Sequence, residues 1–492
     1  MALFDFLKPK EEPKRLKKRD YAAASTSRLL SDLFDSNRSA DSELYPVIRR
    51  IRNRSRELAR NNEYVKKYLE LVKDNVVGKK GFTLQVKALS PNGVLDMDGN
   101  QAVENAFSAW SRMGRCTVDG RMSLVDLQKM VIEGLARDGE VFIIKHRSAS
   151  FRDSFALEII EPDMVDEQKN ETHPNGNDIR MGVELDKFKR PVAYHLLTYH
   201  PGDYDYASLS TKSKHVRVPA DRVMHIYMPN RAGQTRGEPW TAAAIPALKH
   251  LNGFREAAVI NARVSASKMG FFSSNTGDAF PADEYEDNVP QIIAEPGTFH
   301  QLPDNVTFSS FDPTFPSGEF DDFHKSVLKG IASGLGVSYT SLANDLEATS
   351  YSSIRQGALE DRDRYQNLQE FFIEHFMRPV FESWLESAME MGSVSFPLST
   401  YGKFADAATF RGRAWQWVDP AKEMRAAIEG MKAGILSLQD VAANYGKDTE
   451  ELLAQIVRDK ALMEQFGVSY ALEPYAANMS PVPPEGMDDG EV

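Results

Sequence analysis

The chain has 492 residues, a hydrophobic fraction of 42% and a charged fraction of 26%. This composition predicts an ordinary globular protein with roughly two to four domains. The formal net charge of −12 excludes a protein that binds nucleic acid over its whole surface, because phosphate binding needs clustered Lys and Arg. The negative charge is still compatible with a protein that lets DNA slide past without binding it.

Cys116 is the only cysteine, which excludes an internal disulfide and a thiolate metal cluster. We interpret it as a small buried hydrophobic residue. We expect no signal peptide, because Asp5 interrupts the short apolar stretch at the N-terminus and the basic run follows that stretch. No apolar run reaches 18 residues, so we expect no membrane span and a protein used in a reducing cytoplasm or in a particle assembled there.

Residues 1–40 contain a basic patch from Lys8 to Arg19. This segment is interpreted either as a flexible solvated tail or as an arm that contacts a neighbour, a shell or DNA. Apolar residues at helical spacing predict helices over 41–76, and a strand follows Gly81. Helical patterns return at 98–113 and 123–137. Short strands separated by turn residues are then expected at 141–146, 155–160, 181–185, 193–197 and 223–227.

The N-terminal half is therefore expected to be an α+β block with a mostly antiparallel sheet. An Ala-rich helix is expected over 239–268, with Pro246 in its first turn or at a kink. A small β-type or irregular insert follows at 269–318, and then a second helix at 319–336. The segment 337–352 is interpreted as a polar loop.

An amphipathic helix is expected from Ile354 to about Met391, kinked at Pro379 because proline lacks an amide donor. Residues 396–417 are expected to form a strand-like piece, and 419–466 two or three short helices. The last 26 residues are acidic and proline-rich, which is typical of a disordered tail.

The search for catalytic motifs finds no phosphate-binding loop, no H-E-x-x-H and no G-x-S-x-G. Carboxylates cluster at Glu158, Glu161, Asp163 and Asp166, where a nuclease could hold Mg²⁺. Their spacing is not diagnostic, because Glu161-Pro162-Asp163 is equally typical of a turn after a strand. We therefore predict a protein that is not an enzyme, with no catalytic residue, cofactor or metal.

Several segments, in this order, resemble those of lambda-type tailed-phage portal proteins. The opening segment RNRSRELARNNEYVKKYLELVKDNVVGKKGFTLQ at 52–85 resembles the family's R-S-R-x-L-x-R-N-N stretch, helix and N-V-V-G. The other matching segments are ARDGEVFI at 136–143, IEPDMVD at 160–166, GVELDKFKRPVAYHL at 182–196, VPADRVMHIYMPNRAGQTRGEPW at 218–240 and GVSYTSLANDLEATSYSSIRQGALE at 336–360. Together they cover roughly residues 45–390.

The resemblance implies the portal fold of wing, stem, clip and crown. A flexible basic arm at 1–40 would precede a wing at 41–237. The next parts would be stem helix 1 at 238–268, a clip at 269–318, stem helix 2 at 319–336 and a tunnel loop at 337–352. A kinked helix and wing return at 353–417, crown helices at 418–466 and a disordered acidic tail at 467–492 would complete the chain.

The resemblance also implies a function. About twelve subunits would form a ring at one capsid vertex of the virion, through which the terminase packages the genome and from which the genome is later ejected. Expected partners are double-stranded DNA passing through without sequence readout, the terminase large subunit, major capsid and scaffold proteins, and head–tail adaptors, with no membrane. Assembly is expected in the bacterial host cytoplasm.

Candidate channel residues lie on the second stem helix and in the tunnel loop: Lys325, Lys329, Thr340, Ser341, Asn344, Thr349, Ser350 and Tyr351. The alternatives are an ordinary surface loop and a solvated helix face with ion pairs to Asp321 and Asp322. Candidate subunit-interface residues are Arg49, Arg52, Arg56 and Arg60, for which pairing within the chain is the alternative.

Two rival functions remain at this point. One is a Mg²⁺-dependent nuclease that uses Glu158, Glu161 and Asp163. The other is a different structural head protein, such as a capsid subunit or a head–tail adaptor. The layout of helix, insert, helix and loop over 240–352 favours the portal protein, because a shell subunit needs no channel.

Overall fold

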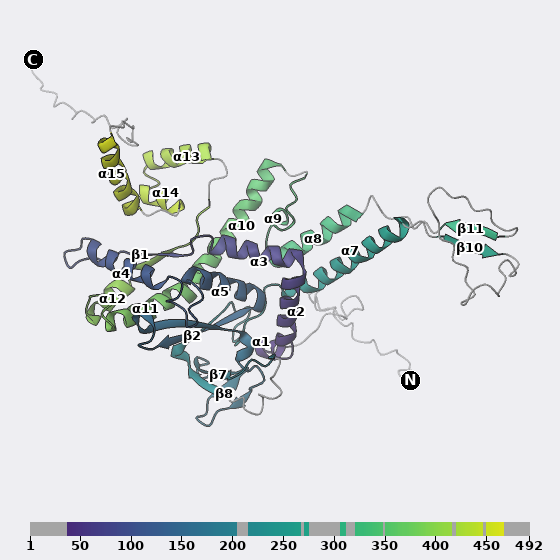
Figure 1. Ribbon diagram of the computed structural model, residues 1–492, viewed down its shortest axis with the longest axis horizontal. Coiled ribbons are helices and arrows are strands. Elements are labelled where there is room, and N and C mark those ends of the chain that lie inside the picture. The colour runs from purple at the N-terminus through teal and green to yellow at the C-terminus, as the bar shows by residue number, and fades with distance from the viewer. Residues whose placement is uncertain are drawn as a thin grey trace, which may run out of the picture.

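The computed structural model describes residues 37–203, 215–266, 270–274, 306–310, 320–347, 350–415, 420–445 and 449–466. Helices and antiparallel strands are mixed along this part of the chain, so the expected α+β class is confirmed (Figure 1). None of the described helices is both long and apolar enough to cross a bilayer.

The N-terminal helices are α1 (Ala40–Leu44), α2 (Ile48–Asn61) and α3 (Glu63–Val76), which confirms the helices expected over 41–76. Asn62 separates α2 from α3. Its extended backbone ends α2, and its side chain accepts a hydrogen bond from the Val65 amide and so caps α3. One residue therefore ends one helix and starts the next in a new direction.

The next two helices are α4 (Met97–Trp110) and α5 (Leu124–Asp138), close to their expected bounds. Ser123 and Asp126 form a reciprocal capping box at the start of α5. Gly139 ends the helix with a φ of 88°, a left-handed conformation that glycine adopts at little cost. The chain then enters the first strand of the central sheet.

Three antiparallel sheets lie in this block. The central sheet has the order β3 (Phe155–Ile160), β2 (Glu140–Arg147), β9 (Val223–Tyr227). The second sheet follows chain order through β4 (Glu171–Thr172), β5 (Asp178–Arg180), β6 (Val183–Leu185), β7 (Pro191–Leu197) and β8 (His215–Pro219). In the smallest, β1 (Thr83–Val86) pairs with β12 (Ala408–Arg411).

All five expected strands of the block are present. The strands β4, β5 and β8 were not foreseen, because β4 and β5 have two and three residues and β8 is largely exposed. Short 3₁₀ turns connect the strands at Arg152–Ser154, Pro162–Met164 and Ala220–Arg222.

The main core lies where the central sheet, α3, α4 and α5 meet the long C-terminal helix. The rings of Phe107 and Trp384 are 5.0 Å apart, and the Trp384 indole donates to Asp153 Oδ2 at 3.0 Å. Cys116 is fully buried here, and burial raises the pKa of its thiol to about 12. The expectation of a small buried residue is confirmed.

The long helix is interrupted as expected. It consists of α10 (Tyr351–Phe372), a π-helical segment (Ile373–Met377) and α11 (Arg378–Glu390). Pro379 is the second residue of α11 and cannot donate a backbone hydrogen bond. The wider π turn before it accommodates this missing bond.

Two long helices project from the block side by side, α7 (Ile245–Ala266) and α8 (Phe320–Leu335) (Figure 1). The ring of Phe254 on α7 stacks on Phe320 of α8 at 5.3 Å. Beyond them β10 (Gly270–Ser274) pairs antiparallel with β11 (Val306–Ser310), which fits the expected small β-type insert. Pro246 lies in the first turn of α7, as expected.

The expected start of the first long helix at 239 was wrong. A 3₁₀ turn (Ala242–Ala244) precedes α7, and the chain before it is bonded to the N-terminal block. The Trp240 amide donates to the Ala136 carbonyl, and the Thr241 hydroxyl donates to Ser55 Oγ. These bonds fix Trp240 to α5 and Thr241 to α2 before α7 begins.

The strand-like piece expected at 396–417 is only partly correct. A 3₁₀ turn (Leu398–Thr400) and α12 (Tyr401–Ala405) come first, and only β12 is extended. The expected short helices follow as α13 (Pro420–Lys432), α14 (Leu438–Asn444) and α15 (Thr449–Phe466). The basic patch of the N-terminal arm and the acidic tail 467–492 lie outside the described residues.

Candidate functional site

The outer half of α8 is the first candidate site, and Lys325 lies at its centre. Its Nζ is 2.7 Å from Asp321 Oδ2, one turn away on α8. Carboxylate oxygens of Asp345 and Glu347 lie 3.7 and 3.8 Å from the same nitrogen. Lys325 therefore joins α8 to the segment that follows α9 (Tyr339–Ala343). The ion pair with Asp321 was one expected alternative, whereas Asp345 and Glu347 were missed because no local spacing relates them to Lys325.

Tyr339 extends this contact network. Its hydroxyl donates to Asp345 Oδ2 at 2.7 Å and thereby lowers the pKa of that carboxyl. Lys329 Nζ lies 5.6 Å from the centre of the Tyr339 ring, as in a cation–π contact. Three carboxylates thus surround the Lys325 ammonium, and they outnumber the two lysines of this surface.

The turn between α8 and α9 is fixed to α10 by Asp361. Its Oδ1 accepts from the Ser338 amide at 2.9 Å, and its Oδ2 accepts from the hydroxyls of Ser338 and Ser341 at 2.7 and 2.9 Å. Arg364, one turn further along α10, donates to the Leu335 carbonyl at 2.7 Å. The end of α8 and the start of α9 therefore have a rigid support.

The sequence predicted a polar loop at 337–352, but the segment is only partly a loop. Ser338 caps α9 and Ser350 caps α10, whose first residue is Tyr351. Asn344 ends α9 with a φ of 53°. The polar residues that indicated a loop are thus helix caps, because Ser and Asn satisfy free backbone groups at helix ends. Of the other candidates, Thr340 lies in α9, with its Oγ1 3.3 Å from Ser338 Oγ, and Thr349 lies outside the described residues.

The structure pairs three of the four candidate interface arginines within the chain. Arg49 contacts Glu167, Arg52 pairs with Glu140 at 2.8 Å, and Arg56 pairs with both Asp138 and Asp163 at 2.7 Å. Arg60 is exposed beside a cleft between α2, α3 and α5. Arg52 is fully buried and has no surface with which to reach a neighbouring subunit.

Glu140 is the centre of a buried charge cluster at the start of β2. Its carboxylate accepts from Arg236 at 2.7–2.9 Å, from Arg52 at 2.8 Å and from the Gly237 amide at 2.9 Å, and it contacts His225 Nε2 at 3.0 Å. Burial by itself would raise the pKa of Glu140, but Arg236, His225 and Arg52 lower it far below its usual value. The cluster holds the chain just before α7 against the sheet.

The charge cluster around Glu140 predicts that the free energy of unfolding decreases as the pH falls. Burial lowers the pKa of His225 below its ordinary 6.5, so the folded protein leaves the ring neutral. As the pH falls below about 6.5, the unfolded chain binds a proton that the folded chain does not, and the free energy of unfolding decreases. A second decrease begins below 4.5, where Glu140 is protonated only in the unfolded chain.

The check is a comparison of wild type with His225→Gln in chemical unfolding between about pH 8 and about pH 5. The amide keeps a hydrogen-bond donor near Glu140 but does not titrate. We expect the wild-type midpoint to fall more steeply with decreasing pH than that of the variant. Equal slopes would contradict the prediction.

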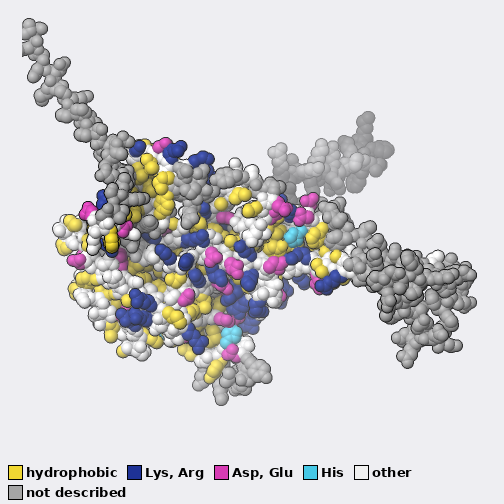
Figure 2. Space-filling view, turned by 45° about the horizontal axis from the view of Figure 1, so that its top comes forward, with side chains coloured by type: hydrophobic (Ala, Val, Ile, Leu, Met, Phe, Trp, Pro, Cys, Tyr) yellow, Lys and Arg dark blue, Asp and Glu magenta, His cyan; other side chains and the backbone are white. Residues whose placement is uncertain are grey.

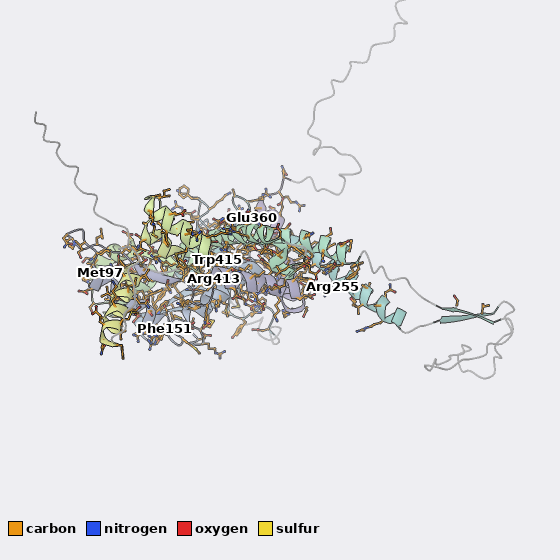
Figure 3. The ribbon with its side chains drawn as sticks, turned by 90° about the horizontal axis from the view of Figure 1, so that it is seen from above. Met97, Phe151, Arg255, Glu360, Arg413 and Trp415 are labelled. Carbon is orange, nitrogen blue, oxygen red and sulfur yellow. The ribbon has the colours of Figure 1, made fainter. Side chains whose placement is uncertain are left out.

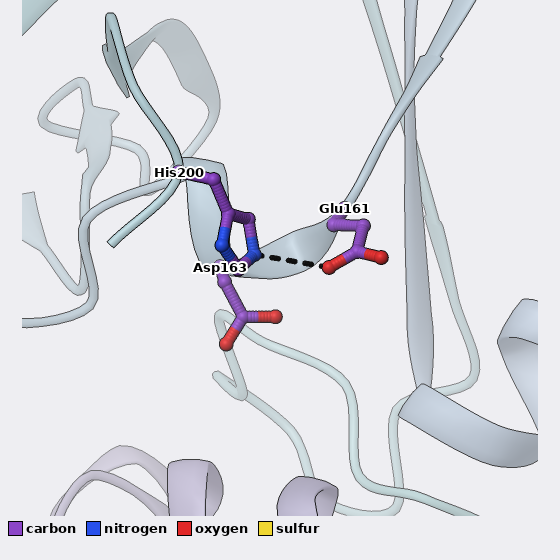
Figure 4. A group of neighbouring side chains, drawn as sticks. All are labelled: Glu161, Asp163 and His200. Carbon is purple, nitrogen blue, oxygen red and sulfur yellow. Dashed lines mark ion pairs between the residues drawn. The ribbon is translucent and has the colours of Figure 1, made fainter. Parts of the chain in front are cut away.

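The structure brings together only some of the carboxylates that the sequence suggested as metal ligands, namely Glu161 and Asp163. Glu161 Oε2 lies 3.0 Å from His200 Nε2, with Asp163 close by (Figure 4). Arg56 Nη2 lies 2.7 Å from Asp163 and 3.7 Å from Glu161, so a guanidinium already supplies positive charge there. His200 was missed, because it is distant in sequence from the other two.

The remaining carboxylates of the nuclease hypothesis lie elsewhere. Glu158 contacts His146 at 2.6 Å and lines a cleft on the other side of the sheet from Glu161. Asp166 contacts His215 at 2.7 Å. The carboxylates therefore do not converge on one ion, and we propose no metal-dependent reaction.

The segment that leads to the C-terminal helices is anchored on α3. Asn75 Oδ1 accepts from Arg413 Nη1 at 3.1 Å and from Trp415 Nε1 at 3.0 Å. Figure 3 shows Arg413 and Trp415 close together, and Arg255 further out on α7. Arg255 contacts Glu63 at the start of α3, so α3 supports both the projecting helices and the C-terminal segment.

Comparison with known proteins gives the family. A model described as phage portal protein, lambda family, matches residues 26–369. A probable portal protein of Halomonas phage phiHAP-1 is 35% identical over 459 residues, which are 92% of this chain and 88% of the relative. The chain belongs to the lambda family of phage portal proteins. Portal protein B of Escherichia phage lambda is 23% identical over 86% of this chain and 85% of that protein.

Among solved structures, a chain from the neck of an empty GTA particle matches with a TM-score of 0.45 and 13% identity, over 80% of this chain and 93% of that chain. The family resemblance and the portal function expected from the ordered segments are confirmed. Portal proteins are structural virion components at a capsid vertex, where they form oligomeric rings with capsid and tail partners.

Proposed function

We propose that about twelve copies of this chain close into a ring and that double-stranded DNA passes through its centre without sequence readout. The α7–α8 pair would be the stem, the insert at 269–318 the clip, the segment 337–352 the tunnel loop and α13–α15 the crown. The α+β block and the return at 353–417 would be the wing. The order of these parts along the chain supports the assignment.

The observation that carries the proposed DNA contact is the acidic surface around Lys325 on α8. Asp321, Asp345 and Glu347 already engage Lys325, so its ammonium is not left free to hold a phosphate. Each Lys or Arg that binds a phosphate adds affinity for DNA. A channel lined in this way would repel the duplex weakly and leave it mobile.

The proposed partners follow from the portal role. The terminase large subunit would drive DNA through the ring during packaging, and head–tail adaptors would bind it afterwards. Major capsid and scaffold proteins would surround it as the particle assembles in the host cytoplasm. The DNA contact needs no base readout, because a ring of many identical subunits cannot match the helical groove pattern at each one.

Electron microscopy tests the proposed ring. Purified full-length protein is expected to form rings of about twelve copies with a central hole. A reconstruction should place the segment 337–352 on the inner wall. Shell-like sheets, or rings with this segment on the outer rim, would contradict the proposal.

The ion pairs of Lys325 predict the mobility of the tunnel loop. In Lys325→Ala, residues 344–347 lose their contact with α8, so amide hydrogen exchange in this segment should become several-fold faster. Lys329→Ala is the matched control, because it removes a lysine of the same helix that contacts the Tyr339 ring and pairs with no carboxylate among the described residues. Equal exchange rates in the two variants would show that the carboxylate contacts do not hold the loop.

A further inference from the structure

The chain contains three Asn-Gly pairs, which begin at Asn92, Asn175 and Asn252. In such a pair the backbone nitrogen of the glycine can attack the side-chain amide of the asparagine, because glycine has no Cβ to hinder the approach. This spontaneous reaction is one reason why asparagine is a thermolabile residue. Which of the three pairs reacts first depends on how the fold holds each side chain.

Two of the pairs lie in turns with nearly the same backbone, Pro91-Asn92-Gly93 and Pro174-Asn175-Gly176. In both turns the glycine amide donates at 2.8 Å to the carbonyl two residues before the asparagine. The φ angles of the two glycines are 80° and 87°. Both asparagines are exposed, and each Oδ1 accepts from the amide two residues later, at 3.2 and 3.1 Å. The backbone therefore does not distinguish Asn92 from Asn175.

The side-chain amide nitrogens distinguish the two turns. Asn175 Nδ2 donates to Glu184 Oε1 at 3.0 Å, and Glu184 is fully buried. To react, Cγ of the asparagine must turn toward the next backbone nitrogen, so this strong bond to a carboxylate would have to break. Asn92 Nδ2 forms no hydrogen bond with any residue that the structure describes. Asn92 is therefore the freer of the two to reach the reactive geometry.

The third pair, Asn252-Gly253, is restrained by a helix. Asn252 Oδ1 accepts from Asn62 Nδ2 at 3.1 Å. Gly253 lies within α7, where a backbone amide bonds to the carbonyl four residues earlier. The glycine nitrogen is thus held in the helix and the asparagine side chain is held by α3's cap residue. This leaves Asn92 as the least restrained of the three.

We propose that Asn92 is a site of spontaneous deamidation in the folded protein and that it reacts before Asn175 and Asn252. Local opening of the exposed turn releases the Gly93 amide from its hydrogen bond. The Gly93 nitrogen loses its proton and bonds to Asn92 Cγ, the Cγ–Nδ2 bond breaks, and ammonia leaves. Water then opens the cyclic imide at either carbonyl and gives aspartate or isoaspartate. One water is consumed and one ammonia is released, with no oxidation or reduction.

The reaction would change an apolar part of the surface. Asn92 lies in the loop between β1 and α4, at the outer end of the α+β block (Figure 1). Leu89, Val94 and Met97 are 54%, 61% and 58% exposed there. Figure 2 shows mainly yellow and white side chains at this end of the molecule, on the left, and Figure 3 labels Met97 at the same end. The product adds a negative charge among these side chains, and isoaspartate also lengthens the main chain by one carbon.

Peptide mapping by mass spectrometry tests the proposal on folded, full-length protein kept warm at mildly alkaline pH. The mass gain that marks conversion of an amide to a carboxyl should appear at position 92 about tenfold faster, or more, than at 175, because a hydrogen bond to a charged group must break at Asn175. An isoaspartate-specific methyltransferase should label the same peptide. Equal rates at 92 and 175, or a faster reaction at Asn175 or Asn252, would overturn the proposal.

Unfolding the protein in urea provides the matched control. Positions 92 and 175 should then react at similar rates, because both are Pro-Asn-Gly. A preference for position 92 that persists in urea would show that the fold does not select it. Asn92→Gln keeps an amide but lengthens the side chain, so the signal at this peptide should disappear.

Glu184→Ala tests the physical cause of the selectivity. The variant frees Asn175 Nδ2, so the rate at position 175 should rise severalfold toward the rate at 92, which should not change. The rate at 252 reports folding, because unfolding of the variant would raise it as well. An unchanged rate at 175 would overturn the role assigned to Glu184. None of these results depends on whether the chain forms a ring.

Discussion

Removal of the Glu140 carboxylate should be among the most damaging single changes in this protein. In Glu140→Ala, Arg236 stays fully buried without the carboxylate that it binds, and Arg52 keeps only its longer contacts of 3.5 Å to Asp163 and Glu167. Breaking a buried ion pair in this way costs about 3–5 kcal/mol of the free energy of unfolding. We expect the denaturant midpoint, followed by circular dichroism, to fall accordingly.

The control is Glu158→Ala on the neighbouring strand. Glu158 is 43% exposed and contacts only the partly exposed His146, so its loss should cost about 1 kcal/mol or less. Glu140→Gln adds a second comparison, because it keeps the shape of the side chain and removes only the charge. Similar midpoints for Glu140→Ala and Glu158→Ala would show that the buried cluster contributes little.

The second large effect is expected at Gly139, where β2 begins. A Cβ added there would lie 2.2 Å from the carbonyl carbon of Glu238, on the segment that leads to α7. Backbone cannot move aside as a flexible side chain can. Gly139→Ala should therefore cost about 3 kcal/mol or more, from the left-handed φ and from the forced shift.

Gly176 provides a matched control for the backbone conformation. Its φ is 87°, against 88° at Gly139, but no atom lies within 4 Å of its Cβ position. Gly176→Ala should lower the free energy of unfolding by only about 1 kcal/mol, because the left-handed backbone is then the sole source of strain. The difference between the two midpoints then measures the contact between the start of β2 and the segment before α7. Equal losses of stability in the two variants would mean that the segment before α7 moves easily to make room for the added Cβ.

These two sites have a common consequence for the projecting helices. Glu140 and Gly139 both hold the chain between Arg236 and Pro239, shortly before α7 begins. Forces on α7 would reach the α+β block through this short segment. The pairing of a buried ion cluster with a close backbone contact makes that junction stiff.

The sequence by itself determined the elements and their order. Apolar spacing predicted α3, α5, α8 and α10, because one face of each helix must be buried and the pattern repeats with the helical period. Pro379 predicted the interruption of the long helix, since the missing donor is a local property. The ordered family segments likewise carried the portal function without any structure.

The tertiary structure decided the contacts between distant parts of the chain. Glu140 with Arg236, Lys325 with Asp345, and Asp361 with Ser338 join residues that no local period relates. It also turned expected loop residues such as Ser350 into helix caps, because a serine in a polar segment can bond either solvent or a helix end. Which partner a charged or polar side chain finds depends on how the chain folds back on itself, and that information lies in the packing of the whole molecule rather than in any one segment.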